Sequence, residues 1–348
     1  MNTSKGRSCL TTMERQVVNS SIPSFRVFTP SNDPAHSSLK FAIDVAVYTV
    51  TIPIPPILMV AGLIGNALSF RLMSQKKYEK STTCFYMRCM AVSDSFYIYG
   101  RMFLRFLLVV APHLFKGKLV NKQVCLYYKV NISISVAISP WILVVMAFDR
   151  FLAVTWPLKA PVICTMGRAK ITAFCIFLLG ISGSMVVTST KFQEKYKYWV
   201  CPYTFDPPWD EIYSFIEISY IGFLPIVLLV VFNFGILAAV QRSKRNRELT
   251  KSTGSSSSDS SITLATILVT TCFIVFQLSD KMNNFFWANW KGEVTPNLLL
   301  IKPLMLNVGV LIEYMNYVLN SFIYVLSCKR LRKEMLEIIC ACRSRRVK

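Results

Sequence analysis

An ionisable pair, Asp149-Arg150, stands at the end of a long apolar segment and is followed by Phe151. Ionised side chains are unfavourable at a lipid boundary. A carboxylate beside a guanidinium at this position therefore indicates an ion pair that serves a function. Cys125 begins the same segment, and at about 1.5 Å per residue a helix from Cys125 to Arg150 would be roughly 37 Å long. This length matches one bilayer with its headgroup edge. One helix is therefore expected to place a cysteine at the outer face of a membrane and a charged pair at the inner face.

A second group of charged side chains lies in the outer halves of the apolar segments, where charge is equally unfavourable. Its members are Arg101, Arg105, Lys129, Glu217, Asp280, Lys281 and Glu313. Such groups normally turn inward to water, to a ligand or to each other, so we interpret them as the lining of a ligand-binding cavity. For each residue, pairing with another member or extension to the outer headgroups is the alternative.

The elements that must position these residues are membrane helices. The chain is 53% hydrophobic and only 16% charged, which leaves too little polar surface for a soluble protein of 348 residues. The predicted spans are Asp44–Met73, Thr83–Val110, Gln123–Val154, Arg168–Val187, Glu211–Val240, Ser261–Trp287 and Leu300–Leu326. Backbone hydrogen bonding in lipid requires helices, because strands of a membrane barrel would be shorter and would alternate in polarity. We therefore predict an all-α, seven-transmembrane helix bundle.

Lysine and arginine predict how the bundle is oriented. If the N-terminus lies outside, basic residues near the helix ends concentrate on the inner side, as membrane proteins require. The formal net charge of +21 then reflects topology and attraction to anionic membrane lipids, and no nucleic acid partner is expected. Residues 1–43 are expected to form an extracellular tail glycosylated at Asn2 and Asn19, residues 44–327 the membrane domain, and residues 328–348 a cytoplasmic tail. The chain is thus predicted to be a multi-pass protein of the plasma membrane.

The cysteines on the predicted outer side offer one structural disulfide. Cys125 at the top of the third span and Cys201 in the loop after the fourth span can meet and hold that loop over the bundle. Cys9 is left over, and is either free or paired with another chain. Aromatic, β-prone residues around Cys201 predict a short hairpin lid, with an ordinary ordered loop as the alternative.

The segment after the last span has its own pattern. Lys329–Ile339 spaces apolar residues at the helical period between charged ones. This pattern predicts a short amphipathic helix on the inner leaflet. Cys340 and Cys342 follow directly and are candidates for palmitoylation, with two inert thiols as the alternative.

Short motifs occur along the spans in a fixed order. They are Gly65-Asn66, Ala91-Val92-Ser93-Asp94, Cys125, Asp149-Arg150-Phe151, Trp156-Pro157-Leu158, Pro225 and Asn320-Ser321-Phe322-Ile323-Tyr324. With these motifs in this order, the chain resembles the rhodopsin-like (class A) G-protein-coupled receptor family from about Asp44 to Cys342. The stretch from Phe151 to Ala160 is similar to invertebrate FMRFamide-type neuropeptide receptors. The resemblance implies activation by an extracellular ligand and signalling through heterotrimeric G proteins, with arrestin and a receptor kinase as further partners.

The resemblance also implies roles for polar residues within the membrane. The family's G-protein coupling switch corresponds to Asp149, Arg150, Asn320 and Tyr324. At rest Arg150 would pair with Asp149, and in the active state it would turn toward the transducer. The family's mid-membrane polar site corresponds to Asp94, Ser139, Asn316 and Asn320. These residues would hold a sodium ion, because a buried carboxylate needs compensation. A protonated or purely hydrogen-bonded Asp94 without the ion is the alternative.

Two absences narrow the class of ligand that the resemblance implies. Ile132 stands where amine receptors carry an aspartate, and Tyr314 stands where opsins carry the lysine that binds retinal. A monoamine would therefore lack its counter-ion, and a retinal Schiff base cannot form. Together with the mixed charges of the outer cavity, these absences favour a short neuropeptide with a basic side chain and polar termini.

The chain also departs from the family pattern. Phe151 and Asn233 replace tyrosines, and Ser321 replaces a proline. In the sixth span Gln277 and Ser279 replace a tryptophan and a proline, which puts the usual kink in doubt. A divergent non-signalling receptor is therefore an alternative, and so is a polytopic transporter, although no internal repeat is seen. No enzyme is expected, because the two histidines lie far from any ligand cluster and no phosphate-binding loop or hydrolase motif is present.

Overall fold

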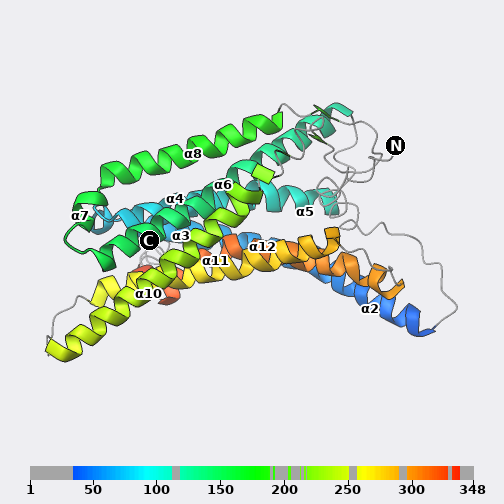
Figure 1. The fold of residues 1–348 in the computed structure, drawn as a ribbon. Coiled ribbons are helices and arrows are strands. Elements are labelled where there is room, and N and C mark those ends of the chain that lie inside the picture. Colours follow the sequence, from blue (N-terminus) through cyan, green and yellow to red (C-terminus); the bar gives the residue numbers. More distant parts are fainter. Residues whose placement is uncertain are drawn as a thin grey trace, which may run out of the picture.

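The computed structural model describes most of the chain as long helices. The described residues are 34–111, 118–188, 191–192, 203–204, 212, 215–216, 218–250, 257–289, 296–327 and 331–337. The helices of the bundle are α2 (Pro34–Thr51), α3 (Ile54–Met73), α4 (Thr82–Tyr97), α5 (Phe103–Val110), α6 (Lys118–Thr155), α8 (Met166–Thr188), α10 (Leu224–Thr250), α11 (Ser257–Asn289) and α12 (Pro296–Ser327). Figure 1 shows them side by side, with the short helix α7 (Ala160–Ile163) and the start of α2 at opposite ends of the bundle. The predicted seven-helix bundle is confirmed, because every predicted span coincides with one helix or with consecutive helical pieces.

Hydropathy alone identifies all but one of the spans. Six helical stretches in the described part of the chain are long and apolar enough to cross a membrane, and the second predicted span is not among them. That span carries Arg88, Asp94, Arg101 and Arg105. Charged residues lower the apparent hydrophobicity of a membrane helix strongly, so this helix depends on polar partners inside the bundle.

The first span is broken into α2 and α3 where three prolines gather. Pro53, Pro55 and Pro56 lie at the break, between Thr51 and the body of α3. Proline has no N–H and its ring clashes with the carbonyl four residues earlier, so each proline interrupts the hydrogen-bond ladder. Pro55 and Pro56 occupy the first turn of α3, where the missing donor is tolerated. The resulting corner forms one wall of a pocket against α5 and α12.

The second span contains a π-helical turn, η2 (Ile98–Met102), between α4 and α5. Gly100 lies in this turn against Asn131 of α6, and a Cβ added to Gly100 would lie 1.9 Å from Asn131 Nδ2. Glycine is therefore required for the close approach of the two helices. A similar turn, η4 (Ile218–Phe223), precedes α10. Such turns often accompany functional sites because they change which side chains face inward.

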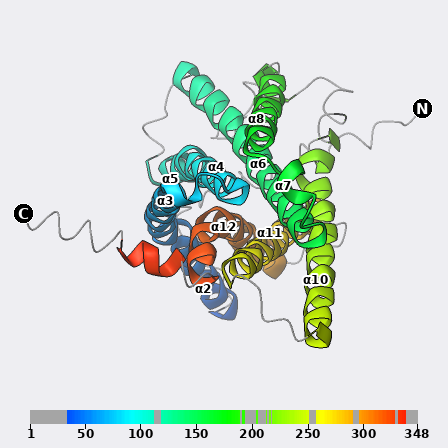
Figure 2. The same ribbon diagram turned by 90° about the vertical axis from the view of Figure 1, so that its left-hand side faces the viewer.

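The helix α6 lies at the centre of the bundle, where it contacts α4, α8 and α10, while α11 lies along α12. Figure 2 looks along the bundle and shows α8 and α10 at its edge. Leu143, Met146 and Leu229 are fully buried between these helices. Outward-facing Ile57 and Phe234 are 67% and 70% exposed, as expected of side chains that contact lipid.

A short helix over residues 331–337 follows α12, which confirms that the segment after the last span is helical. It appears in red beside the bundle in Figure 2. Its Leu331 is buried, and Glu334 Oε2 accepts a hydrogen bond of 2.8 Å from Tyr78 Oη. Lys77 Nζ lies 2.7 Å from the same Glu334 oxygen. These two residues of the short helix η1 (Lys76–Tyr78) therefore hold the C-terminal helix against the bundle.

A two-stranded hairpin forms in the loop after α8. Strands β1 (Lys191–Phe192) and β2 (Tyr203–Thr204) pair antiparallel, with Lys191 opposite Thr204. This pairing confirms the predicted hairpin. Cys201 lies outside the described residues.

Candidate functional site

The inner site is a carboxylate that receives three donors. Arg150 Nη2 lies 2.9 Å from Asp149 Oδ2, and their side chains are 15% and 6% exposed. Thr83 Oγ1 donates to the same oxygen at 2.9 Å, and Thr82 Oγ1 donates to Asp149 Oδ1 at 2.8 Å. Arg150 is thus paired as expected of the resting state, and the carboxylate is also tied to the second span.

The start of α4 places the two threonines. Ser81 is its N-cap, and the Ser81 side chain accepts from the backbone N–H of Cys84. This cap fixes the first turn, which carries Thr82 and Thr83 toward Asp149 of α6. The sequence reading missed both threonines. The sequence did contain a signal for them. Two threonines begin one membrane helix at its inner end, level with the Asp-Arg pair at the inner end of another helix.

The inner site also changes the chemistry of a nearby thiol. Cys164 lies in the connection between α7 and α8. Burial raises the pKa of the Cys164 thiol to about 11, because a thiolate is poorly solvated there, and the negative charge of Asp149 adds to the rise. The thiol is therefore protonated at neutral pH.

Two departures from the family pattern have structural explanations at the inner half of the bundle. The Phe151 ring packs against Phe232 of α10 with centroids 5.8 Å apart, and a Cβ added to Gly235 would lie 2.5 Å from this ring. Asn233, in place of a tyrosine, accepts a hydrogen bond of 2.9 Å from Thr270 Oγ1. Because Thr270 belongs to α11, this bond joins the fifth and sixth spans.

Tyr324, the last predicted member of the coupling switch, is buried at the inner end of α12. Its hydroxyl donates to the sulfur of Met146 at 3.6 Å. Methionine sulfur is a weak acceptor, so the hydrogen bond from the Tyr324 hydroxyl is weak. Among the described residues, the Tyr324 hydroxyl makes no hydrogen bond to Asp149 or Arg150.

The mid-membrane site centres on Asp94, which is fully buried. Ser139 Oγ donates to Asp94 Oδ1 at 2.8 Å, and Asn320 Nδ2 donates to Asp94 Oδ2 at 2.8 Å. Ser93 Oγ lies 3.0 Å from Ser139 Oγ. Asn316 is 3% exposed, and its Oδ1 has no hydrogen-bond partner in the described part of the chain. The structure therefore brings Asp94, Ser139 and Asn320 into direct contact and leaves the buried Asn316 oxygen about one helical turn before Asn320.

The serine that replaces the family's proline also makes a specific contact. Ser321 Oγ donates to Asn66 Oδ1, and both residues are buried. Asn66 lies in α3 and Ser321 in α12, so the contact joins the first and seventh spans. Asn66 Nδ2 has no partner among the residues that the structure describes.

The outer site contains a buried ion pair between the second and seventh spans. Arg101 Nη2 of η2 lies 2.9 Å from Glu313 Oε2 of α12, with side chains 18% and 9% exposed. The Arg101 guanidinium also lies over the Tyr97 ring at 5.8 Å, and this ring stacks on Tyr317 with centroids 3.5 Å apart. Mutual pairing, an alternative left open by the sequence, is thus observed for Arg101 and Glu313. Both side chains are largely shielded from water, which strengthens the attraction between their charges.

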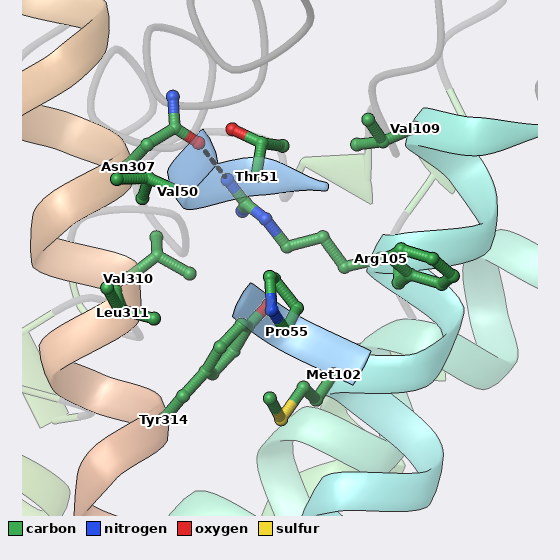
Figure 3. Close-up of a pocket in the computed structure, with 11 residues that line it drawn as sticks. Val50, Thr51, Pro55, Met102, Arg105, Val109, Asn307, Val310, Leu311 and Tyr314 are labelled. Carbon is green, nitrogen blue, oxygen red and sulfur yellow. Dashed lines mark hydrogen bonds between the residues drawn. The ribbon is translucent and has the colours of Figure 1, made fainter. Parts of the chain in front are cut away.

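A pocket lies beside this ion pair, about one turn further out. Figure 3 shows Arg105 extending across it from α5 toward Asn307 of α12. Arg105 Nη2 donates to Asn307 Oδ1 at 3.4 Å, and Asn307 Nδ2 donates to the Pro303 carbonyl at 2.8 Å. The free space of this pocket, open solvent included, is about 310 Å³. Its lining is Val50, Thr51, Pro55, Met102, Arg105, Phe106, Val109, Asn307, Val310, Leu311 and Tyr314.

Of the other four predicted ligand-binding residues, only Lys281 has a described side chain, and it does not line this pocket. Lys281 is exposed on α11. The predicted members whose side chains lie outside the described residues are Lys129, Glu217 and Asp280. Asn307, which the sequence reading missed, instead completes the pocket. Its only sequence signal was an amide in an apolar span.

The predicted covalent modifications are not located by the structure. Cys125 belongs to α6, but its side chain lies outside the described residues. The other residues concerned, all outside the described ranges, are Cys201, Asn2, Asn19, Cys340 and Cys342. The disulfide, the glycosylation and the palmitoylation stay predictions.

Comparison with known proteins agrees with the class that the fold and these sites define. The model of the 7 transmembrane receptor (rhodopsin family) matches residues 65–324, so the chain belongs to this family. Among individual proteins, it is similar to lysophosphatidic acid receptor 6 of Gallus gallus. The identity is 25% over 221 residues, which cover 61% of this chain and 67% of that protein. The chain is therefore a multi-pass, non-enzymatic signalling receptor whose partners are a ligand and a G protein.

Proposed function

We propose that this receptor is activated at the plasma membrane by a short extracellular peptide and signals through a heterotrimeric G protein. The observation that supports the peptide most strongly is the outer ion pair, Arg101 with Glu313, beside the cation Arg105. Ionic groups at this depth are unfavourable and are normally kept for a ligand or a conformational change. A peptide supplies both a basic side chain and a carboxylate to such a lining.

A connected series of contacts leads from the outer site to the middle of the membrane. It begins with the Arg101–Glu313 pair and continues through the stack of Tyr97 on Tyr317. It ends at the hydrogen bond from Asn320 to Asp94. Each contact joins the second span to α12. A ligand that binds Glu313 and releases Arg101 would therefore break the outermost contact between the second span and α12. Loss of this contact would shift the conformational equilibrium at the contacts further inward.

The proposal is tested by a calcium-reporter screen of a neuropeptide library on cells that express the receptor. Arg150→Ala is the control, because it removes the group expected to engage the G protein and leaves the outer site intact. We expect a peptide to raise calcium in wild-type cells and to bind the control variant at matched surface levels without signalling. Equal signalling by both receptors would contradict the role of Arg150. A peptide that binds both receptors and activates neither would favour the non-signalling alternative.

We also propose that the mid-membrane site binds sodium in the resting state. The residues present fit the ion, because Asp94 supplies a buried carboxylate and the free Oδ1 of Asn316 supplies a further oxygen. When bound, the ion would offset the carboxylate charge. Ser139 and Asn320 orient the carboxylate through their hydrogen bonds. An ion that favours the resting state must weaken agonist binding, so agonist affinity should rise when sodium is replaced by N-methylglucamine. Unchanged affinity would contradict the site.

A lysophospholipid is the second candidate ligand. It is favoured by the similarity to lysophosphatidic acid receptor 6 and by the apolar lining around Arg105. Lysophosphatidic acid in the same calcium assay separates the candidates. A response to this lipid, with none to any peptide, would replace the peptide by the lipid.

A further inference from the structure

We infer that the pocket between α2, α3, α5 and α12 binds an anionic group at the end of an apolar stem, and that Arg105 holds the anion. The inference rests on the proposed peptide ligand and adds to it the group that the peptide presents. That group is a free carboxylate next to an apolar residue. The resemblance to FMRFamide-type receptors, by contrast, would imply a neutral terminal amide.

The pocket is a built feature of the fold, because the proline corner creates one of its walls. Val50, Thr51 and Pro55 flank the break between α2 and α3 and line the pocket. An unbroken helix would continue past this point, but the prolines interrupt its ladder. The free space of the pocket is only about 310 Å³ even with open solvent counted, which is small for a ligand site. It therefore suits one terminus of a peptide and not a whole peptide.

The two arginines of this region differ in how their charge is compensated. Arg101 has the Glu313 carboxylate at 2.9 Å. Arg105 has a neutral partner, Asn307, at the longer distance of 3.4 Å, and no carboxylate among the residues that the structure describes lies within 4.0 Å of it. A partly buried guanidinium without a counter-charge is unfavourable. The binding free energy of an incoming anion would therefore be more favourable at Arg105 than at Arg101.

Asn307 keeps the Arg105 guanidinium aimed across the pocket. Asn307 is 4% exposed, and its own amide N–H is engaged by the Pro303 carbonyl. Its oxygen therefore faces Arg105 in a fixed orientation and accepts a hydrogen bond from one N–H group of the guanidinium. The remaining donors form the planar fork that binds a carboxylate through two parallel hydrogen bonds.

The rest of the lining selects what is attached to the anion. Phe106 and Val109 lie on the α5 side, and Val310 and Leu311 lie on the α12 side. Apolar side chains on both sides favour an apolar stem and disfavour further charges. A carboxylate that follows a leucine-like or aromatic residue fits both parts of the pocket.

The direct test uses purified receptor and two small probes that differ only in the terminal group, the carboxylate N-acetyl-leucine and the neutral amide N-acetyl-leucinamide. Thermal unfolding in detergent at increasing probe concentrations reports binding to the folded state. On the wild-type receptor we expect the carboxylate to bind at least tenfold more tightly than the amide, which corresponds to about 1.4 kcal/mol. Equal binding of the two probes, or no binding of the carboxylate, would overturn the inference without any variant.

Three variants assign the effect to Arg105. Arg105→Gln should abolish the preference for the carboxylate, and Arg105→Lys should keep part of it because the charge remains while the fork is lost. Lys170→Gln removes one exposed cation at the inner end of α8 and should keep the full preference. A preference that persists in Arg105→Gln, or that disappears in Lys170→Gln, would show that net charge and not this pocket is responsible.

A cell assay then separates this inference from the proposed peptide. Each library peptide is tested as a free acid and as an amide, and lysophosphatidic acid is tested against neutral monooleoylglycerol. Free-acid peptides that lose at least tenfold in potency on Arg105→Gln support both proposals. The same loss for the lipid phosphate alone supports the anion site and contradicts the peptide. Amidated peptides that are as potent as their acids support the peptide and contradict the anion site.

Discussion

The hydrogen bonds from Thr82 and Thr83 to Asp149 allow a sharp test of the resting inner site. Replacing either threonine by valine keeps the shape and removes one donor to a buried charge. A hydrogen bond to a charged group contributes about 1.5–3 kcal/mol. Thr83 is 0% exposed and Thr82 is 7% exposed, so water replaces the lost donor less easily at Thr83. We therefore expect the larger effect from Thr83→Val.

The expected rise in basal activity can be calculated if these hydrogen bonds exist only in the resting state. A loss near the lower end of that range, about 1.4 kcal/mol, changes an equilibrium tenfold. A receptor with about 1% of its molecules active at rest would then have roughly 10% active. Basal nucleotide exchange on a purified G protein, measured without ligand at equal receptor concentration, should rise about tenfold in Thr83→Val and less in Thr82→Val.

Thr266→Val is the matched control. Thr266 is equally buried, but its hydroxyl donates to the Ile262 carbonyl within its own helix. Its basal exchange should stay within about twofold of wild type, because a bond within one helix is present in both states. Basal exchange that is unchanged or lower in both Asp149-contacting variants would refute the reasoning. Lower exchange would mean that the threonines compete with Arg150 for the carboxylate, and unchanged exchange would mean that their hydrogen bonds contribute equally to both states.

Three further outcomes are expected. Gly100→Ala should lower the melting temperature, because the new methyl group would overlap Asn131 and such overpacking costs about 1–3 kcal/mol; Asn131→Ala in the same chain should restore it. Glu334→Gln should speed hydrogen exchange over residues 331–337, because the ionic contact of this helix to the bundle is lost. Cys164 should react with iodoacetamide more than tenfold more slowly than a free cysteine peptide at pH 8, as read by mass spectrometry. Its raised pKa of about 11 leaves little thiolate until the pH approaches that value.

Each of these outcomes has its own control. Gly183→Ala should leave the melting temperature within a degree or two, because nothing lies within 4 Å of the added Cβ. Lys77→Gln should reproduce part of the Glu334→Gln effect, since it removes the other half of the ion pair. Rapid alkylation of Cys164 at pH 8 would contradict its raised pKa.

The apolar segments could be predicted closely because membrane insertion depends on local composition. The second predicted span began at Thr83 and the helix begins at Thr82, and both end at Val110. The resemblance placed Asp94 with Asn320, because these residues lie on helices whose arrangement the family shares. Local composition therefore predicted the membrane spans, and the resemblance predicted the contact of Asp94 with Asn320.

Contacts that depend on how two helices meet could not be predicted from the sequence. The π-helical turn at Gly100 rotates the outer part of the second span, and no periodicity in the sequence marks it. The pairing of Arg101 with Glu313 was one of several arrangements that the charges allowed. Asn307 resembled any other amide in an apolar span until the proline corner placed it opposite Arg105.

The charges of the second span also constrain how the protein is made. The carboxylate partner of Arg101 and one of the two hydrogen-bond partners of Asp94 lie on α12, which is synthesised long after the second span has left the ribosome. An arginine or aspartate at the centre of a membrane helix opposes insertion by about 2.5–3.5 kcal/mol. The second span is therefore poorly suited to settle in the bilayer alone, and it must be retained near the translocon or by a chaperone until the last helix arrives. Chains truncated before Glu313 should accordingly be retained in the endoplasmic reticulum and degraded.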